Sequence, residues 1–228
     1  MKEKYTIIVA GGKGLRMGKD IPKQFLALAG RPVLFHTLEV FYRYDPKIRI
    51  ILVLPQEQEV YWKKLCRERS MTIPHQVVAG GETRFHSVKN ALDVIPENVL
   101  VAVHDGVRPL VSENLLEKAF ETAEEKGGAY PVIPLTDSLR YYTEDNKKES
   151  VAVDRSAYCL VQTPQIFCSE ILKEAYKQDP EKSFTDDVSV VEAMDHFSPE
   201  MIDGEKENLK ITTPIDLIIA EAILKCRI

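Results

Sequence analysis

Ile7-Ile-Val-Ala-Gly-Gly-Lys-Gly-Leu-Arg-Met-Gly18 joins a short apolar run to a glycine-rich loop. The run Tyr5–Val9 is apolar almost throughout, as expected of a strand that is covered on both faces of a sheet. In a parallel sheet, ligands bind at the carboxyl ends of the strands, and the turn after the first strand is a usual place. Glycines there let backbone N–H groups approach a phosphate closely. We therefore predict that a phosphate-bearing ligand binds after the first strand of an α/β sheet.

Two well-known phosphate-binding motifs do not fit this loop. A P-loop needs four residues between its first glycine and a Gly-Lys pair that is followed by Ser or Thr, and the loop lacks this pattern. A dinucleotide fingerprint needs GxGxxG, whereas three residues separate Gly14 from Gly18. The loop instead carries four basic side chains within one short stretch: Lys13, Arg16, Lys19 and Lys23. This density suits a polyphosphate whose leaving group needs its charge neutralised.

Outside the loop, short apolar runs alternate with amphipathic segments, which is typical of a doubly wound α/β sheet. Strands are predicted at Tyr5–Val9, Arg49–Leu54, Gln76–Val78, Val99–Val103, Ala129–Ile133 and Tyr158–Val161. Helices are predicted at Val33–Tyr44, Arg84–Val94 and Ser112–Lys126, and from the capping box Thr213-Pro-Ile-Asp216 to Leu224.

Residues 138–154 break this alternation. Two strand-like pieces, Leu139–Tyr142 and Val151–Val153, flank the polar turn Thr143–Ser150, and this pattern predicts a β-hairpin that projects from the sheet. A solvated surface hairpin and an arm that meets another subunit both fit it. We find no internal repeat or linker, so we predict a single domain over residues 1–228 with residues 138–154 as its arm.

Composition narrows the functional class. The chain is 44% hydrophobic and 29% charged, which is ordinary for a globular protein, and its net charge of −5 argues against nonspecific binding to nucleic acid or anionic membrane. No apolar run approaches membrane-spanning length, and no signal-peptide pattern precedes the first strand. The 4 cysteines are scattered without CxxC spacing, which indicates a reducing compartment rather than a zinc site or a disulfide framework. We expect a cytoplasmic protein without nucleic-acid or membrane partners.

Five blocks of the sequence carry a recognisable combination of motifs. The first is the glycine-rich loop extended by Pro22-Lys23-Gln24-Phe25. The others are Ala79-Gly-Gly-Glu-Thr-Arg-Phe-His-Ser87-Val, Val103-His-Asp-Gly-Val-Arg-Pro109, Val153-Asp-Arg155 with Gln162-Thr-Pro-Gln165, and Thr185-Asp-Asp187 with Asn208-Leu-Lys-Ile-Thr-Thr-Pro214. In order and spacing these blocks resemble the 2-C-methyl-D-erythritol 4-phosphate cytidylyltransferases, a family of sugar-phosphate nucleotidyltransferases, and the resemblance covers essentially the whole chain.

The resemblance implies a Rossmann-like, mostly parallel α/β fold and a homodimer joined through the projecting arm. It also implies Mg²⁺-dependent transfer of CMP from CTP to methylerythritol phosphate with release of pyrophosphate, a step of non-mevalonate isoprenoid biosynthesis. Most members have Ala-Ala-Gly where this chain has Ala10-Gly-Gly12, and most have alanine at Gly106. Both differences are small and fall at positions of backbone contact.

By resemblance, Arg16 and Lys23 are catalytic cations that neutralise the triphosphate and the transition state, and Lys210 reaches the α-phosphate from the opposite side. Such residues suit an in-line attack by one phosphate on another, since positioning and electrostatic stabilisation supply most of the catalysis.

The resemblance also implies a nucleotide site made mainly of backbone groups. Its residues are Ala10, Gly11, Gly12, Gly14, Gly80, Gly81, Ser87, Asp105 and Gly106. Gly80 and Gly81 with the Ser87 hydroxyl would read the edge of the cytosine. Asp105 would lie beside the ribose and the metal-bound phosphates, and it is the candidate Mg²⁺ ligand, with most of the coordination coming from phosphates.

The acceptor phosphate needs its own cationic pocket, for which the family pattern selects Arg155, Thr163 and Thr185. Because Arg155 directly follows the arm, it can serve its own site or that of a partner subunit. Arg108 either touches the phosphates or braces its loop. Asp186 and Asp187 lie at a predicted helix start, where we favour interaction with the helix dipole over metal binding.

Three other functions are open at this stage. A ribitol 5-phosphate cytidylyltransferase would share the loop and the cytidine blocks and differ only in its acceptor. A nucleotide-sugar glycosyltransferase usually holds its metal with Asp-x-Asp, which this chain lacks. A non-catalytic nucleotide-binding module would have no need to keep Arg16, Lys23 and Lys210 together.

Overall fold

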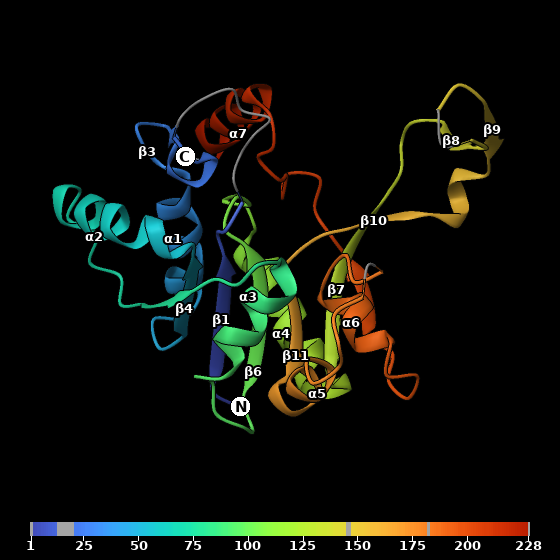
Figure 1. The fold of residues 1–228 in the computed structure, drawn as a ribbon. Helices are drawn as coiled ribbons and strands as arrows, with labels where there is room; N and C mark the ends of the chain where they lie inside the picture. Colours follow the sequence, from blue (N-terminus) through green and yellow to red (C-terminus); the bar gives the residue numbers. More distant parts are fainter. Residues whose placement is uncertain (1, 13–20, 145–146, 182, 228) are drawn as a thin grey trace.

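The computed structural model describes residues 2–12, 21–144, 147–181 and 183–227 of the chain (Figure 1). Within them lies an eight-stranded sheet of order β10-β7-β11-β6-β1-β4-β5, with β12 paired to β7. Its strands are β1 (Lys4–Val9), β4 (Arg49–Leu54), β5 (Gln76–Ala79), β6 (Leu100–Asp105), β7 (Gly128–Pro134), β10 (Cys159–Val161), β11 (Gln165–Cys168) and β12 (Glu200–Asp203).

The sheet is mixed but mostly parallel. Strands β6, β1, β4 and β5 run parallel to one another, and β12 runs parallel to β7. Strand β11 is inserted antiparallel between β6 and β7, and β10 is antiparallel to β7. The predicted α/β class with a mostly parallel sheet is therefore confirmed. The sequence did not predict β11 or β12, which are only four residues long.

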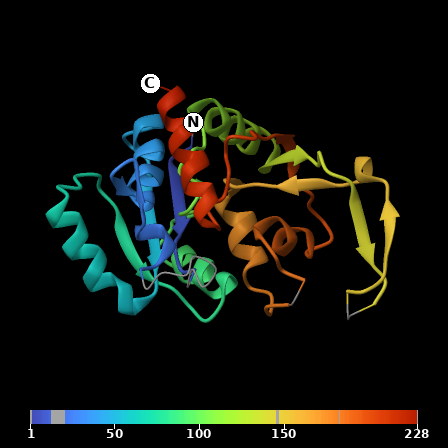
Figure 2. The ribbon, with the colours of Figure 1, turned by 90° about the horizontal axis from the view of Figure 1, so that it is seen from above.

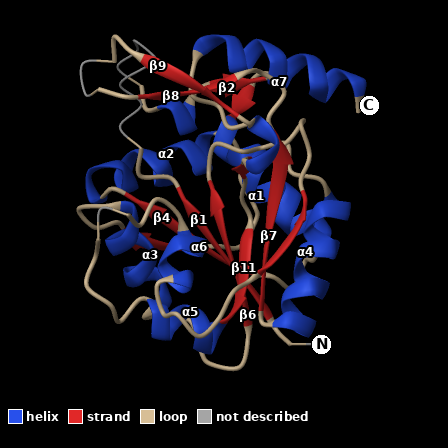
Figure 3. Ribbon diagram, turned by 90° about the vertical axis from the view of Figure 1, so that its right-hand side faces the viewer, coloured by secondary structure: helices blue, strands red, loops and turns tan. Residues whose placement is uncertain are grey.

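Helices cover both faces of the sheet (Figure 3). On one face lie α1 (Val33–Tyr44) and α4 (Glu113–Lys126), and on the other lie α3 (Arg84–Leu92), α5 (Ser169–Ala175) and α6 (Asp187–Glu192). Helix α2 (Glu59–Glu68) buries Trp62, whose ring meets Phe35 of α1 edge to face. Of these helices, α2 and α5 were not predicted, whereas the start of α6 at Asp186 and Asp187 was. No helix in the described parts of the chain is both long and apolar enough to cross a membrane.

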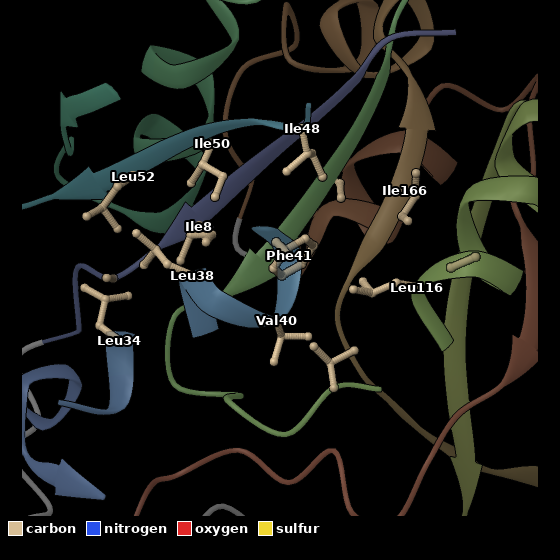
Figure 4. Packing of buried hydrophobic residues seen from close by; sticks show 14 of the residues in the cluster. Ile8, Leu34, Leu38, Val40, Phe41, Ile48, Ile50, Leu52, Leu116 and Ile166 are labelled. Carbon is tan, nitrogen blue, oxygen red and sulfur yellow. The ribbon is translucent and has the colours of Figure 1, made fainter. Parts of the chain in front are cut away.

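The core of the α1 face follows from the spacing of its apolar residues. Leu34, Leu38 and Phe41 recur at i, i+4 and i+7, so one side of α1 faces the sheet, and all three are completely buried. Figure 4 shows them beside Ile8 of β1 and Leu52 of β4. This packing fixes the ends of β1 and β4, from which the candidate site is built.

Helix α7 (Pro214–Cys226) lies above the carboxyl ends of the parallel strands (Figures 1 and 2). It begins at the predicted capping box, in which Thr213 and Asp216 bond each other's backbone N–H groups. Its Ala220 is buried with Ile211 and with Leu28 of the short hairpin β2 (Ala27–Leu28) and β3 (Arg31–Pro32). The chain just before α7 is thereby held near the strand ends.

The predicted hairpin is present as β8 (Leu139–Tyr142) and β9 (Ser150–Val153), paired antiparallel from Leu139 opposite Val153 to Tyr142 opposite Ser150. Figures 1 and 2 show it standing away from the central sheet. Several apolar side chains on and beside it are about half exposed or more: Tyr141, Tyr142, Val151, Tyr158 and Leu160. An exposed apolar patch of this kind is typical of an interaction surface.

Candidate functional site

The strand register brings the segments after four strands to one edge of the sheet. Val9 is level with Asp105 of β6 and with Val53 of β4, and Leu54 is level with Ala79 of β5. A cavity of about 590 Å³ opens at this edge. Its lining includes these residues predicted for the site: Ala10, Gly11, Gly12, Lys23, Gly80, Gly81, Ser87, Asp105 and Lys210. Chain segments 200 residues apart in sequence therefore share one cavity.

A larger groove, of about 880 Å³, lies at the opposite edge of the sheet. Tyr5, Arg49 and Gln76, at or near the starts of β1, β4 and β5, line it, and its lining contains none of the predicted site residues. Ligands of parallel sheets bind at the carboxyl ends of the strands. The smaller cavity is therefore the candidate site.

The first wall of the cavity is the beginning of the glycine-rich loop. The Ala10 N–H donates to Val53 O at 2.9 Å, and the side-chain amide of Gln24 donates to Ala10 O at 2.7 Å. At Gly12, a Cβ atom would lie 3.4 Å from Cε of Lys23, so the lysine stem packs along this glycine. Gly14 and Arg16, both predicted for the site, lie outside the described residues.

The second wall is the turn between β5 and α3. The Gly80 N–H donates to Leu54 O at 2.8 Å, and the Gly81 N–H donates to Ser87 Oγ at 3.1 Å. A Cβ on Gly81 would lie only 2.4 Å from Cβ of His86, so this turn requires glycine. The Ser87 hydroxyl thus closes the turn as an acceptor, and its own proton remains available for a ligand.

Asp105, the last residue of β6, is the buried carboxylate of the cavity, whose lining also includes Glu57 and Glu82. Its carboxylate lies 2.8 Å from Nζ of Lys210 and 3.4 Å from Nε of Arg108. Burial alone would raise the pKa of Asp105, but Lys210, Arg84 and Arg108 hold that pKa well below its usual value. The carboxylate is therefore ionised and fixes the head group of Lys210 at the cavity. Gly106 follows it, and a Cβ there would lie 3.0 Å from Cβ of Ala10.

Arg108 braces the loop that carries Lys210. Its Nη1 donates to Asn208 O at 2.7 Å, in addition to its contact with Asp105. Of the two roles open from the sequence, this geometry favours bracing. Arg108 does not belong to the cavity lining.

Thr163, predicted for the acceptor site, supports the end of β6. It is 5% exposed, and its hydroxyl accepts the Asp105 N–H at 3.1 Å and meets Nδ1 of His104 at 3.1 Å. His104 is completely buried, which lowers its pKa to about 4, and its Nε2 lies 3.0 Å from Arg108 O. A neutral ring that donates from Nε2 and accepts at Nδ1 satisfies all of these contacts.

Arg155 and Thr185 lie apart from the cavity lining. Arg155 begins the 3₁₀ turn η4 (Arg155–Ala157), separated by one residue from the end of β9, and its guanidinium donates to the carbonyl of Thr136. Thr185 is exposed, and its N–H donates to Ser189 Oγ at 3.1 Å. The described part of this chain therefore does not bring the predicted acceptor residues to the lining of its own cavity.

Sequence reasoning missed a buried ion pair beside the cavity. Arg84, which lines the cavity, donates to both carboxylate oxygens of Asp187, at 2.9 Å and 2.6 Å. Asp187 is completely buried and also accepts from the hydroxyl of Tyr176 at 2.6 Å. Asp186 caps α6 as the dipole interpretation expected, but the main partner of Asp187 is Arg84. No local pattern could reveal this pair, because its members are 103 residues apart.

Replacing Asp187 with asparagine is expected to lower the free energy of unfolding by about 3 kcal/mol, since it leaves the Arg84 guanidinium without its counter-charge. Urea denaturation followed by circular dichroism measures this. Glu221→Gln is the matched control, because it removes only the exposed i,i+4 pair with Lys225 and should cost less than about 1 kcal/mol. Equal losses in the two variants would contradict this account.

Comparisons with known proteins give matches over nearly the whole chain. The family model of 2-C-methyl-D-erythritol 4-phosphate cytidylyltransferase (IspD) matches residues 5–226. The protein of that name from Azobacteroides pseudotrichonymphae is 56% identical over 224 residues, covering 98% of this chain and 100% of its own. The one from Bacteroides thetaiotaomicron is 52% identical over 219 residues, covering 96% and 98%.

Solved structures show the same fold. The crystal structure of 2-C-methyl-D-erythritol 4-phosphate cytidylyltransferase from Thermus thermophilus superposes with a TM-score of 0.77 at 31% identity, covering 99% of this chain and 100% of that one. The 4-diphosphocytidyl-2C-methyl-D-erythritol synthase of Anaerococcus prevotii gives a TM-score of 0.80 at 28% identity, covering 98% and 96%. The sequence and fold of this chain, with the family match over residues 5–226, show that the chain belongs to the 2-C-methyl-D-erythritol 4-phosphate cytidylyltransferase family.

Proposed function

We propose that the protein transfers CMP from CTP to 2-C-methyl-D-erythritol 4-phosphate and releases pyrophosphate. The observation that carries this proposal is the cavity at the carboxyl edge of the sheet, where Lys23, Asp105 and Lys210 meet two glycine turns. Family membership supplies the nucleotide and the acceptor, because its relatives are named for this reaction.

In this proposal the triphosphate lies along the glycine-rich loop, with Ala10, Gly11, Gly12 and Gly14 as its backbone contacts. The base lies against Gly80 and Gly81, where the Ser87 proton is free to meet the cytosine edge. Asp105 and Gly106 lie beside the ribose. A Cβ on Gly81 would clash with His86, and one on Gly106 would crowd Ala10, so glycine at both positions serves packing within the chain.

The chemistry is an in-line displacement at the α-phosphorus. A phosphate oxygen of the acceptor forms the new P–O bond while the bond to the bridging oxygen breaks, and pyrophosphate leaves with that electron pair. Lys23 neutralises charge on the departing side, with Arg16 assigned to the same task. Lys210 stabilises the equatorial oxygens, and its ion pair with Asp105 orients it before the reaction.

The residues at the cavity fit a magnesium ion that is held mainly by phosphates. Among the described residues, no group of three His, Cys, Asp or Glu side chains could hold a metal alone. Asp105 offers one ionised carboxylate, and Mg²⁺ at nucleotide sites needs only one or two of these beside phosphate oxygens. The ion would neutralise charge on the triphosphate.

We assign the acceptor phosphate to Arg155 and Thr185, and we propose that the protein is a homodimer. Thr163 and Arg108 support this site indirectly, through Asp105 and Asn208. One domain spans residues 1–228, and its arm, residues 138–154, contacts the partner. The exposed apolar side chains of the arm support this, as does the position of Arg155 beyond the cavity lining of its own chain. A cytoplasmic location is proposed from the scattered cysteines.

The acceptor is tested by measuring pyrophosphate release with CTP and Mg²⁺ against a panel of polyol phosphates. We expect turnover with methylerythritol 4-phosphate and a rate at least about 10²-fold lower with ribitol 5-phosphate, since an acceptor site built for one ligand leaves polar groups unpaired with another. Turnover with ribitol 5-phosphate alone would make the protein a pentitol-phosphate cytidylyltransferase. No release with any acceptor would leave the nucleotide-binding module as the remaining candidate.

Lys23→Ala is expected to lower kcat by roughly 10²-fold or more, because a cation that acts on developing charge in the transition state is lost. Steady-state kinetics with saturating CTP measures this. Lys63→Ala on α2 is the control, since that side chain is exposed and lies outside the cavity lining. A rate near that of the wild type for Lys23→Ala would refute its catalytic role.

Subunit mixing tests whether Arg155 acts across the dimer. Lys23→Ala and Arg155→Ala homodimers are each expected to be nearly inactive. If Arg155 serves the partner, a mixed dimer has one intact site, and random mixing restores about a quarter of the wild-type activity. No recovery in a mixture that mass spectrometry shows to contain mixed dimers would assign Arg155 to its own subunit. A monomer in analytical ultracentrifugation would refute the dimer.

A further inference from the structure

Lys210 lies in a segment without helix or strand, between β12 and α7. Its side chain is 42% exposed, so packing around the lysine does not fix its position. The position of its head group, 2.8 Å from Asp105, therefore depends on that ion pair and on the way its backbone is held.

The backbone before Lys210 is anchored by Asn208, which is completely buried. Nδ2 of Asn208 donates to Thr163 O at 2.8 Å. The Asn208 N–H donates to Glu205 O at 3.0 Å, which closes a turn over residues 205–208, and its own carbonyl accepts from Arg108 at 2.7 Å. Every polar group of the Asn208 backbone and one end of its side chain thus hold the segment in place.

Gln162 holds the other end of the same turn. It is 3% exposed, its Nε2 donates to Glu205 O at 2.8 Å, and its Oε1 accepts the Glu205 N–H at 3.1 Å. The approach depends on Gly204, where a Cβ would lie 2.6 Å from Gln162 Oε1. Beyond the lysine, the Ile211 N–H donates to Val107 O at 2.9 Å. Lys210 therefore lies between two fixed backbone positions.

Thr163 links this anchor to the partner of the lysine. Its carbonyl accepts a hydrogen bond from Nδ2 of Asn208, and its hydroxyl accepts one from the N–H of Asp105. Thr163 is thus hydrogen-bonded to Asp105 directly and to the segment of Lys210 through Asn208, so it helps to position both members of the ion pair. We propose that Asn208 is a positioning residue that sets the place of Lys210 at the reacting phosphate, an inference that rests on the proposed cytidylyl transfer for its kinetic consequence.

A double-mutant cycle in the full-length enzyme tests this. Asn208→Ala is expected to lower kcat by about tenfold or more with a change in KM for CTP below about threefold, since a misplaced group loses transition-state stabilisation rather than substrate binding. In an enzyme that already carries Lys210→Ala, the same replacement should lower kcat by less than about twofold, because there is no lysine left to position. A kcat loss of the same factor in both backgrounds would overturn the proposal.

The matched control is Gln178→Ala. The Gln178 amide also bonds two backbone carbonyls, of Ala175 and Val190, but it lies between α5 and α6, outside the cavity lining. Its loss is expected to lower Tm without changing kcat in either background. Gln162→Met provides a second test variant, because it removes the bonds to Glu205 at similar volume, and it should behave as Asn208→Ala does.

A measurement that does not depend on catalysis tests the positioning of Lys210 independently of the proposed function. Competitive acylation of lysines followed by mass spectrometry reports how well Asp105 protects Nζ of Lys210. The labelling rate of Lys210 relative to Lys63 should rise severalfold in Asn208→Ala and stay constant in Gln178→Ala. Unchanged labelling in a folded Asn208→Ala variant would overturn the proposal. An inactive wild-type enzyme would refute the proposed function alone and leave this result standing.

Discussion

Asp105 is 8% exposed, and a buried charge is tolerated only where opposite charges compensate its lost hydration. Lys210, Arg84 and Arg108 supply this compensation from three different parts of the chain. Arg84 is in turn balanced by Asp187, which is completely buried. Lys210 and Arg84, two cations of the cavity, are thus each held by a buried carboxylate, and the positions of α3, α6 and the segment before α7 depend on these pairs.

An anion-binding site needs several cations in one place, and it also needs groups that keep those cations in place before the anion binds. Cations at a phosphate site must be close together, yet they repel one another when no anion is bound. Asp105 and Asp187 offset that repulsion, so Lys210 and Arg84 face the cavity with their positions already fixed. Groups that are oriented beforehand stabilise developing charge without reorganising during the reaction.

Patterns within short stretches of the sequence predicted the features that depend on neighbouring residues, namely helix starts and the buried sides of helices. The spacing of Leu34, Leu38 and Phe41 predicted the buried side of α1, and Ser112 and Thr213 predicted two helix starts that both show side-chain caps. Nine of the residues that the resemblance selected line one cavity, whereas Gly106, Arg108, Arg155, Thr163 and Thr185 lie outside its lining. The sequence did not predict β11, because four residues inserted antiparallel between parallel strands carry no periodic signal. Nor could it reveal that the Thr163 hydroxyl supports Asp105, since that bond joins positions 58 residues apart.

The order of strands in the sheet has a consequence for synthesis on the ribosome. Strand β6 pairs with β1 on one side, but its other neighbour, β11, emerges about sixty residues later, and β12 must follow before the far edge is complete. The anchor at Asn208 and the lysine that it holds emerge almost last. A nascent chain can therefore form the glycine-rich end of the cavity long before Lys210 is made, and premature termination anywhere before residue 210 yields a protein without the lysine that pairs with Asp105.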